Sequence, residues 1–184
     1  MNIFYIHEDP TTCAQQHVDK HVVKMILEYA QLLSTAHRVL DGNHIDGYSK
    51  TGRKQSTFVL PDSRESLLYS ATHINHPSAV WVRQSSSNYG WLYRLFGHLC
   101  NEYTHRYGKI HASARLIPFL KQPPKNIPEN GFSAPWRAMP EDYKADRSEP
   151  DYTIKSYRAY YLGAKTSMFR WKNRSQPEWI NAIY

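Results

Sequence analysis

The stretch HVDKHVVKMILEYAQLLSTAHR, residues 17–38, decides the fold that this chain is expected to adopt. At about 100° per residue, its polar side chains fall within about a third of a helix circumference. We name this set the polar seam: Lys20, His21, Lys24, Glu28, Gln31, Thr35 and Arg38. The remaining circumference is apolar, whereas an ordinary surface helix has a narrow apolar stripe and a broad polar face. The pattern predicts a helix from residue 20 to about 40 that is buried nearly all round.

Charged groups on a mostly buried helix need partners or a wet cleft, because burying an unpaired charge is costly. One interpretation makes the polar seam a cleft wall, which carries an acid/base pair and cations for an anionic ligand. The other makes Lys20, Lys24 and Glu28 helical ion pairs at a spacing of four on a solvent-facing side. We favour the cleft.

The spacing of His17 and His21 invites a comparison with the zinc-binding HExxH helix. In that motif the general-base Glu follows the first His, and here the position holds Val18. A third ligand would have to be Glu28 or His37. We therefore expect no metal site, and no motif indicates any other cofactor.

The composition indicates a folded chain with an anionic partner. The chain has 184 residues, 41% hydrophobic and 21% charged, which fits one globular domain. A net charge of +7 and a pI near 9.4 favour nucleic acid as the partner. Walker A, dinucleotide-binding and GxSxG motifs are not visible.

The expected location is the cytoplasm, or the host cytoplasm if the chain is viral. Cys13 and Cys100 are far apart and form no CxxC pair, which indicates a reducing compartment. The start MNIFYIHEDP does not have the pattern of a signal peptide. No apolar run is long enough for a membrane span, so no membrane partner is expected. We expect a monomer.

The expected fold class is mainly α, a compact single-domain helical bundle with a short N-terminal extended arm and a long Pro-rich loop. Asp9 and Pro10 suit a helix start, and Asp19 is a candidate cap for a second helix. The expected elements are an arm (2–6), a helix through TTCAQQHV, the helix from 20 to about 40, a surface connection that suits a hairpin (41–62), a short helix (62–71), a long helix within 72–109 from Pro77 to Gly108, a shorter helix (111–121), an irregular Pro-rich wrapped loop (122–150), and a C-terminal helix and basic-aromatic tail (151–184).

Two further clusters are candidates for phosphate binding. His73, Asn75 and His76 precede a helix start, where free amide groups favour an anion, although Asn75 alone could cap that helix. Arg83 follows on the same helix. Residues 151–184 carry six Lys or Arg against two acids, an excess of 6 − 2 = +4, interleaved with aromatic residues. The candidates there are Arg158, Lys165, Arg170, Lys172 and Arg174.

The layout resembles the pyrimidine-dimer DNA glycosylase (endonuclease V) family and its viral and bacterial relatives. The likeness rests on the short N-terminal arm, then DPTTCAQQHVDKHVVKMILEYAQLL, NHPSAVWVRQSSSNYGWL and EYTHRYGK, and the aromatic-basic C-terminus. The resemblance implies a compact α-helical enzyme that binds duplex DNA, flips a nucleotide from the stack and attacks the sugar C1′ with an amine. It implies that Glu28 is the assisting carboxylate, that Lys20, Lys24 and Arg38 hold phosphates, and that His21 relays protons.

The N-terminus departs from the family pattern. The family nucleophile is the α-amine of a small residue exposed after methionine removal, and here position 2 is Asn. The Met1 amine, Lys24 or a water activated by Glu28 is therefore the candidate nucleophile. The expected function is base excision from damaged or modified DNA by an N-glycosylase, with or without AP-lyase activity. The alternatives are a non-catalytic nucleic-acid-binding or inhibitor protein and a hydrolase of free nucleotides.

Overall fold

The central helix predicted from the polar seam is present. The computed structural model of the chain describes residues 1–48, 51–52 and 54–181. Helix α1, Pro10–Gln16, begins where expected, with the Thr12 amide donating to Asp9 Oδ1 at 2.8 Å. Helix α2, Asp19–Asp41, follows after a bend. Its N-cap is Val18 rather than Asp19, because Asp19 accepts a hydrogen bond at 2.8 Å from the buried Arg106.

The long helix expected within 72–109 is two helices. Helix α4 spans Pro77–Arg83, and helix α5 spans Ser86–Tyr107. Ser85 breaks the run: its backbone is extended, and its Oγ accepts hydrogen bonds from the amides of Ser87 and Asn88. A serine can interrupt a helical pattern because its hydroxyl accepts hydrogen bonds from the first free amides of a new helix. Gly108 ends α5 in the left-handed conformation, as the sequence predicts.

Apart from α7, the remaining elements are short. The connection after α2 contains an antiparallel hairpin in which Asn43 pairs with Val59. The elements before the Pro-rich segment are β1 (Asn43–Tyr48), β2 (Lys54–Val59), α3 (Arg64–Leu67), η1 (Ala112–Leu116) and α6 (Ile117–Leu120). Those that follow are η2 (Glu141–Tyr143), α7 (Tyr152–Ala164), η3 (Thr166–Met168) and η4 (Glu178–Ile180). The expected C-terminal tail is described as far as Asn181.

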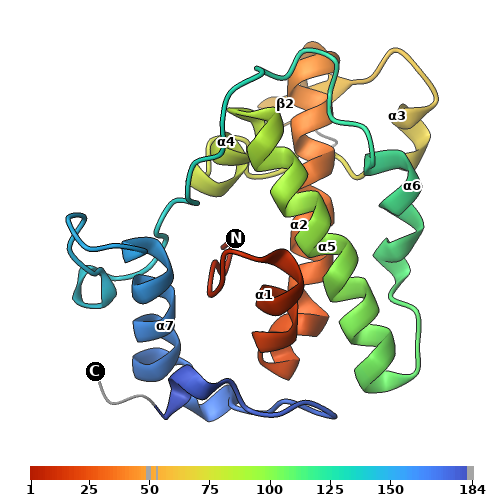
Figure 1. The fold of residues 1–184 in the computed structure, drawn as a ribbon. Helices are drawn as coiled ribbons and strands as arrows, with labels where there is room; N and C mark the ends of the chain where they lie inside the picture. The colour runs from red at the N-terminus through yellow and green to blue at the C-terminus, as the bar shows by residue number, and fades with distance from the viewer. Residues whose placement is uncertain (49–50, 53, 182–184) are drawn as a thin grey trace.

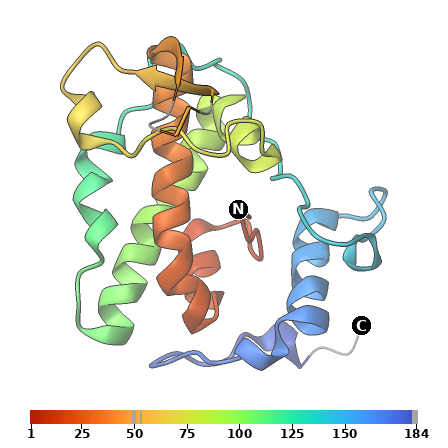
Figure 2. The ribbon, with the colours of Figure 1, turned by 180° about the vertical axis from the view of Figure 1, so that it is seen from behind.

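Helix α2 packs against α4 and α5, and α1 packs against α5. Helix α7 stands to one side of this group and is reached by the long segment that follows α6 (Figures 1 and 2). The N-terminal arm lies between α2 and α7 (Figure 1). The molecule is mainly α and compact, and the arm is where its two sides meet.

The N-terminal arm is part of the core. Ile3, Phe4, Tyr5 and Ile6 are all buried. The Phe4 amide donates to the Tyr29 hydroxyl of α2 at 3.2 Å, and Arg158 Nε of α7 donates to the Ile6 carbonyl at 3.0 Å. These bonds satisfy backbone groups that have no partner in a strand or helix. The arm is thereby fixed to both sides.

Candidate functional site

The solvent exposure of the polar seam changes along α2. Lys20 and Lys24 are exposed and Glu28 is partly exposed, whereas Thr35 and Arg38 are buried. On the adjoining face, Val23 and Leu27 are about two-fifths exposed, so the first half of α2 is less buried than its apolar pattern predicts. The half of the polar seam nearest the N-terminus of α2 is the part that meets solvent.

That half lines a cavity of about 450 Å³. Four parts of the chain supply its ionisable groups: the N-terminus, α2, the residue that caps α4, and the residue that follows α7. They are Met1, Lys20, His21, Lys24, Glu28, His76 and Lys165. All four residues predicted to be catalytic, and three of those predicted to bind phosphate, therefore meet in one place.

Asn2 fixes the chain end at this cavity. Its Nδ2 donates to the Ala138 carbonyl at 2.8 Å, and its Oδ1 accepts from the Tyr157 hydroxyl at 2.8 Å. Both polar atoms of the Asn2 side chain are therefore hydrogen-bonded, one to the Pro-rich segment and the other to α7. Because Ile3 is buried on the other side, Met1 has little freedom to leave the cavity.

Lys24 and Glu28 form an ion pair one helical turn apart. Lys24 Nζ lies 3.3 Å from Glu28 Oε1. The Lys24 side chain is 71% exposed and that of Glu28 is 15% exposed, so the carboxylate is the more enclosed partner. An exposed pair of this spacing adds about 0.3–0.5 kcal/mol to stability, which does not explain an enclosed carboxylate.

His76 lines the same cavity as the chain end and Glu28. Its Nδ1 accepts a hydrogen bond from the Ser78 amide at 3.1 Å, which caps α4 and leaves the ring proton of the neutral form on Nε2. Burial lowers the pKa of His76, the Met1 ammonium and His73 lower it further, and Glu28 opposes them. The amine and the carboxylate therefore both act electrostatically on this imidazole.

His21 forms the inner wall of the cavity and is held as a neutral ring. Its ring stacks on Phe4 with centroids 4.1 Å apart, and its Nδ1 lies 2.7 Å from the Tyr161 hydroxyl. Burial, followed by the charges of His17, Lys165 and Lys24, lowers the pKa of His21 to about 3. A general acid or base works best with a pKa near the working pH. This geometry suits a positioning role better than the proton relay that the resemblance implies.

Arg38 does not belong to this cavity, which corrects its expected role in phosphate binding. Its guanidinium donates to the carbonyls of Phe58, Glu65, Leu68 and Tyr69 and to the Glu65 carboxylate. Arg38 is only 4% exposed. A buried guanidinium saturated by the protein has no donor left for a phosphate. Arg38 ties α2 to the hairpin and α3.

The other residues predicted near the start of α4 are dispersed. His73 is exposed, adopts a positive φ of 50° and bonds to its neighbour Thr72. Asn75 lines a different cavity, and the cap of α4 is His76 rather than Asn75. Arg83 Nη1 donates to the Ile74 carbonyl at 2.7 Å, which fixes the turn before α4.

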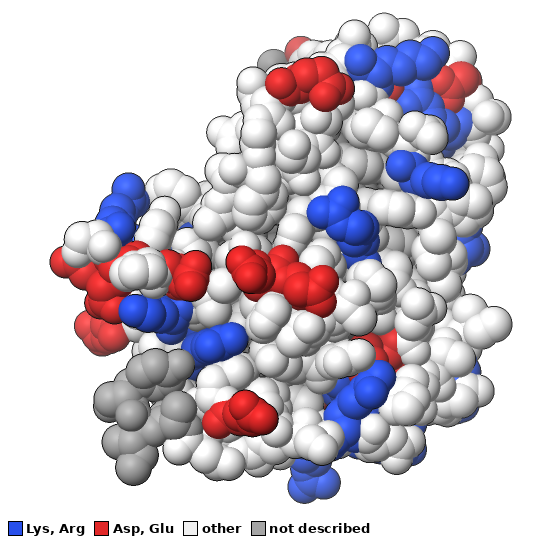
Figure 3. All heavy atoms as spheres, in the orientation of Figure 1, with Lys and Arg blue, Asp and Glu red and all other residues white. Residues whose placement is uncertain are grey.

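The C-terminal cations also serve different purposes. Arg174 bonds to the buried Glu102 at 2.5 Å, and Arg158 lies over the Trp179 ring at 5.3 Å. Lys172 lies over the Tyr107 ring at 5.3 Å, and the carbonyl of Arg170 accepts from the Asp19 amide at 2.9 Å. On the face shown in Figure 3, Lys and Arg occur singly or in small groups among acids. Of the predicted tail cations, only Lys165 joins the cavity.

The two histidines of the HxxxH spacing have separate partners. His17 Nδ1 lies 2.7 Å from the Cys13 carbonyl, whereas His21 bonds to Tyr161. Among the described residues, no group of three or more His, Cys, Asp or Glu side chains is placed to hold a metal ion. No helix in the described part of the chain is long and apolar enough to cross a membrane.

Several residues that shape the cavity from outside α2 were not predicted from the sequence. Asn2, Ala138 and Tyr160 line it, and Tyr157 anchors it. Nothing in the local pattern brings residues 2, 138 and 157 together, since these contacts depend on how the long segment after α6 returns to the N-terminus. Only the apolar run of residues 3–6 indicated that the arm would be buried.

Comparison with protein-family models, with curated proteins and with solved structures finds no match for this chain.

Proposed function

We propose that this protein is a DNA base-excision enzyme, an N-glycosylase with AP-lyase activity, whose centre is the cavity between the chain end and α2. The observation that carries the proposal is that Met1 and Glu28 line one cavity with three lysines, Lys20, Lys24 and Lys165. An amine, an enclosed carboxylate and several cations are the groups that the resemblance to the pyrimidine-dimer glycosylase family calls for.

In the proposed reaction, the lone pair of an uncharged amine forms a bond to the sugar C1′. The bond between C1′ and the base breaks, and its electron pair leaves with the base, which takes up a proton. The nitrogen then loses one proton, and its lone pair forms a second bond to C1′ as the bond between C1′ and the ring oxygen O4′ breaks. O4′ keeps that electron pair and takes up a proton, and a protonated Schiff base between the amine and C1′ results. The Glu28 carboxylate stabilises the positive charge that develops at C1′.

The Met1 amine is the better nucleophile of the two named candidates. A nucleophilic amine must be uncharged, and α-amines as a class lose their proton near pH 8, against about 10.4 for lysine side chains. Lys24 Nζ is also held in its ion pair with Glu28 at 3.3 Å. Lys24, Lys20 and Lys165 are better suited to bind the phosphates that flank the extruded nucleotide.

The proposed partner is double-stranded DNA, from which one nucleotide is extruded into the cavity. A cavity of about 450 Å³ lies in the size range of sites for single small ligands, about 300–1,000 Å³. It is too small for a duplex, so the reacting base must leave the stack. The positive net charge of the chain favours binding of the DNA duplex on either side of the extruded nucleotide.

The test is base release from duplexes that carry UV lesions, alkylated bases or uracil. We expect release with at least one of these substrates, and a loss of about 100-fold or more in Glu28→Gln. The matched control is Glu8→Gln, which removes an exposed acid outside the cavity. Salt-sensitive DNA binding that Glu28→Gln leaves intact, with no product from any substrate, would instead identify a non-catalytic binding protein.

A further inference from the structure

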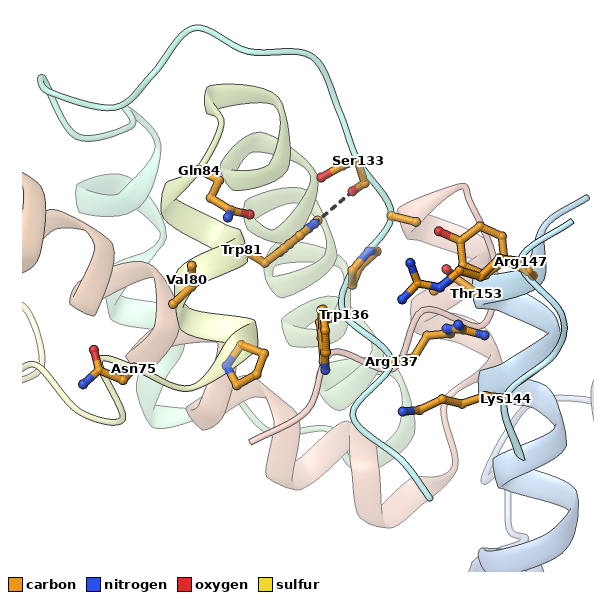
Figure 4. Close-up of a pocket in the computed structure, with 14 residues that line it drawn as sticks. Asn75, Val80, Trp81, Gln84, Ser133, Trp136, Arg137, Lys144, Arg147 and Thr153 are labelled. Carbon is orange, nitrogen blue, oxygen red and sulfur yellow. Dashed lines mark hydrogen bonds between the residues drawn. The ribbon is translucent and has the colours of Figure 1, made fainter. Parts of the chain in front are cut away.

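A second cavity, of about 520 Å³, lies beside the first. The same two segments line both: His76 and Ala138 face the first cavity, whereas Asn75, Pro77 and Arg137 face the second. One wall comes from α4, and the other from the loop after η2 and the start of α7, with residues 133–137 of the Pro-rich segment running between them (Figure 4). Three cations and several aromatic rings line it, and no lining residue is acidic.

Trp136 stands between the two walls (Figure 4). It is 54% exposed, although its backbone is fixed by a hydrogen bond of 2.7 Å from the Tyr157 hydroxyl to its carbonyl. Its companion Trp81 is buried, and the Trp81 Nε1 donates to the Ser133 carbonyl at 2.9 Å. An indole on a fixed backbone, open on one side, is a stacking platform for a flat ring.

The cations lie on the opposite wall from α4 (Figure 4). Arg137 is held in place: its Nη1 donates to the Ala145 carbonyl at 2.6 Å and to Ser156 Oγ at 3.2 Å, and its guanidinium lies 4.8 Å from the centre of the Tyr152 ring. Within the described residues, the hydrogen bonds of Arg137 to protein groups run through Nη1, which leaves donors on the same fork for a ligand.

The acids of the neighbouring loop have their nearest partners within that loop, although the charge of Arg137 also helps to lower the pKa of Glu141 and of Asp146. Glu141 pairs with Lys144 at 2.5 Å, and Asp146 accepts from the amide and the hydroxyl of Ser148. Arg147 is exposed, and within the described parts of the chain its side chain has no hydrogen-bond or ion-pair partner. With Lys144 paired, two guanidinium groups remain for an anion, and guanidinium matches the geometry of a phosphate.

We propose that this second cavity binds a nucleoside monophosphate unit, with the base stacked on Trp136 and the phosphate held by Arg137 and Arg147. A ring platform and a pair of guanidinium groups in one cavity match a ligand that is flat at one end and anionic at the other. The cavity volume fits a single such unit. No residue lines both cavities, so this proposal does not depend on whether the first cavity carries out base excision.

The test is titration of the full chain with adenosine 5′-monophosphate, followed by the indole N–H resonances of its five tryptophans. The Trp136 resonance is the one that disappears in Trp136→Phe. We expect it to shift saturably, and we expect adenosine and inorganic phosphate each to bind about tenfold more weakly. Arg147→Ala is expected to weaken nucleotide binding about tenfold, and Trp136→Ala by a similar factor.

Three controls keep the result specific. Trp136→Phe retains a ring and is expected to bind within about threefold of the wild type. Lys109→Ala removes an exposed cation at the end of α5 and is expected to change nothing. Glu28→Gln is also expected to bind the nucleotide normally, because Glu28 does not line the second cavity. Nucleotide binding therefore tests this proposal separately from the proposed base-excision activity.

A second titration with a short single-stranded oligonucleotide separates the two sources of this ligand. Tighter binding of the strand with the same dependence on Trp136 and Arg147 would support a unit bound within a nucleic acid; tighter binding of the free mononucleotide would support a soluble ligand. The proposal is overturned if neither ligand shifts the Trp136 resonance, or if both bind equally well to Trp136→Ala and Arg147→Ala.

Discussion

The Tyr157 hydroxyl lies 2.8 Å from Asn2 Oδ1, across a separation of 155 residues in the chain. The same hydroxyl lies 2.7 Å from the Trp136 carbonyl. One buried side chain of α7 thus positions both the chain end at the first cavity and the exposed tryptophan at the second. The two proposed sites share this anchor, although they share no ligand-binding group.

Tyr157→Phe is therefore expected to affect both function and stability. The hydroxyl is lost without a change in ring packing, and Asn2 Oδ1 and the Trp136 carbonyl lose the single proton that they share, which costs about 1–2 kcal/mol. Because the chain end is then less fixed, Schiff-base formation should slow by about tenfold. The measurement is single-turnover trapping with borohydride, together with urea unfolding. Tyr93→Phe is the matched control, since its hydroxyl bonds to the Ile117 carbonyl at 3.1 Å, away from both cavities.

Arg38→Met is expected to destabilise the fold by about 3–5 kcal/mol, because four carbonyl groups and Glu65 lose a buried partner. Arg38→Lys should also be destabilising, since an ammonium cannot reproduce the planar fork. Urea unfolding measures both. If Arg38→Lys kept full stability but lost DNA affinity, Arg38 would be a phosphate ligand after all.

Stability is expected to fall as the pH is lowered from about 6.5 towards 4. Burial lowers the pKa of His17 to about 4, of His21 to about 3 and of His37 to about 4, so these rings stay neutral in the fold. The unfolded chain binds protons at these residues below about pH 6.5, so stability is fully present above that pH and is lost below it. Each histidine contributes a slope of up to about 1.4 kcal/mol per pH unit.

The check on this prediction is unfolding in urea at a series of pH values. His37→Gln should reduce the slope by about one proton. A stability that is flat between pH 7 and 5 would mean that the buried rings are protonated in the fold.

Lys165→Ala is expected to weaken DNA binding by a similar factor for all sequences. Lys165 lines the first cavity and lies 4.6 Å from the centre of the Tyr160 ring, which holds its charge near the proposed phosphate position. Removing one phosphate contact should reduce the slope of log affinity against log salt by about 1. Fluorescence anisotropy at several salt concentrations measures this slope, with Lys109→Ala as the control. An unchanged slope would place Lys165 outside the DNA contact.

The sequence predicts what depends on local pattern. The helix 19–41, the break before Asp19, the buried arm and the glycine that ends α5 all follow from periodicity and capping. The convergence of Met1, His76 and Glu28 on one cavity agrees with the cleft expected from the polar seam. The break at Ser85 was not predicted, because a serine within a helical pattern does not reveal whether its hydroxyl will cap a new helix.

The burial of Arg38 could not be predicted for a different reason. On a helical projection Arg38 belongs to the same polar seam as Lys24, and a projection carries no information about what covers each turn. The hairpin, α3 and the loop after α3 cover the last turns of α2 and use every donor of Arg38. The second cavity was missed because its walls come from three separate parts of the chain.

The most direct test of the proposed function is borohydride trapping on a duplex with an abasic or UV-damaged site, followed by mass spectrometry of the trapped peptide. We expect a covalent adduct on the Met1 amine, an unchanged adduct yield in Lys24→Met, and at least a 100-fold slower reaction in Glu28→Gln. An adduct on Lys24 would move the nucleophile within the same cavity. The absence of any adduct would contradict the lyase mechanism, and base release that survives in Glu28→Gln would contradict the assignment of this cavity as the catalytic centre.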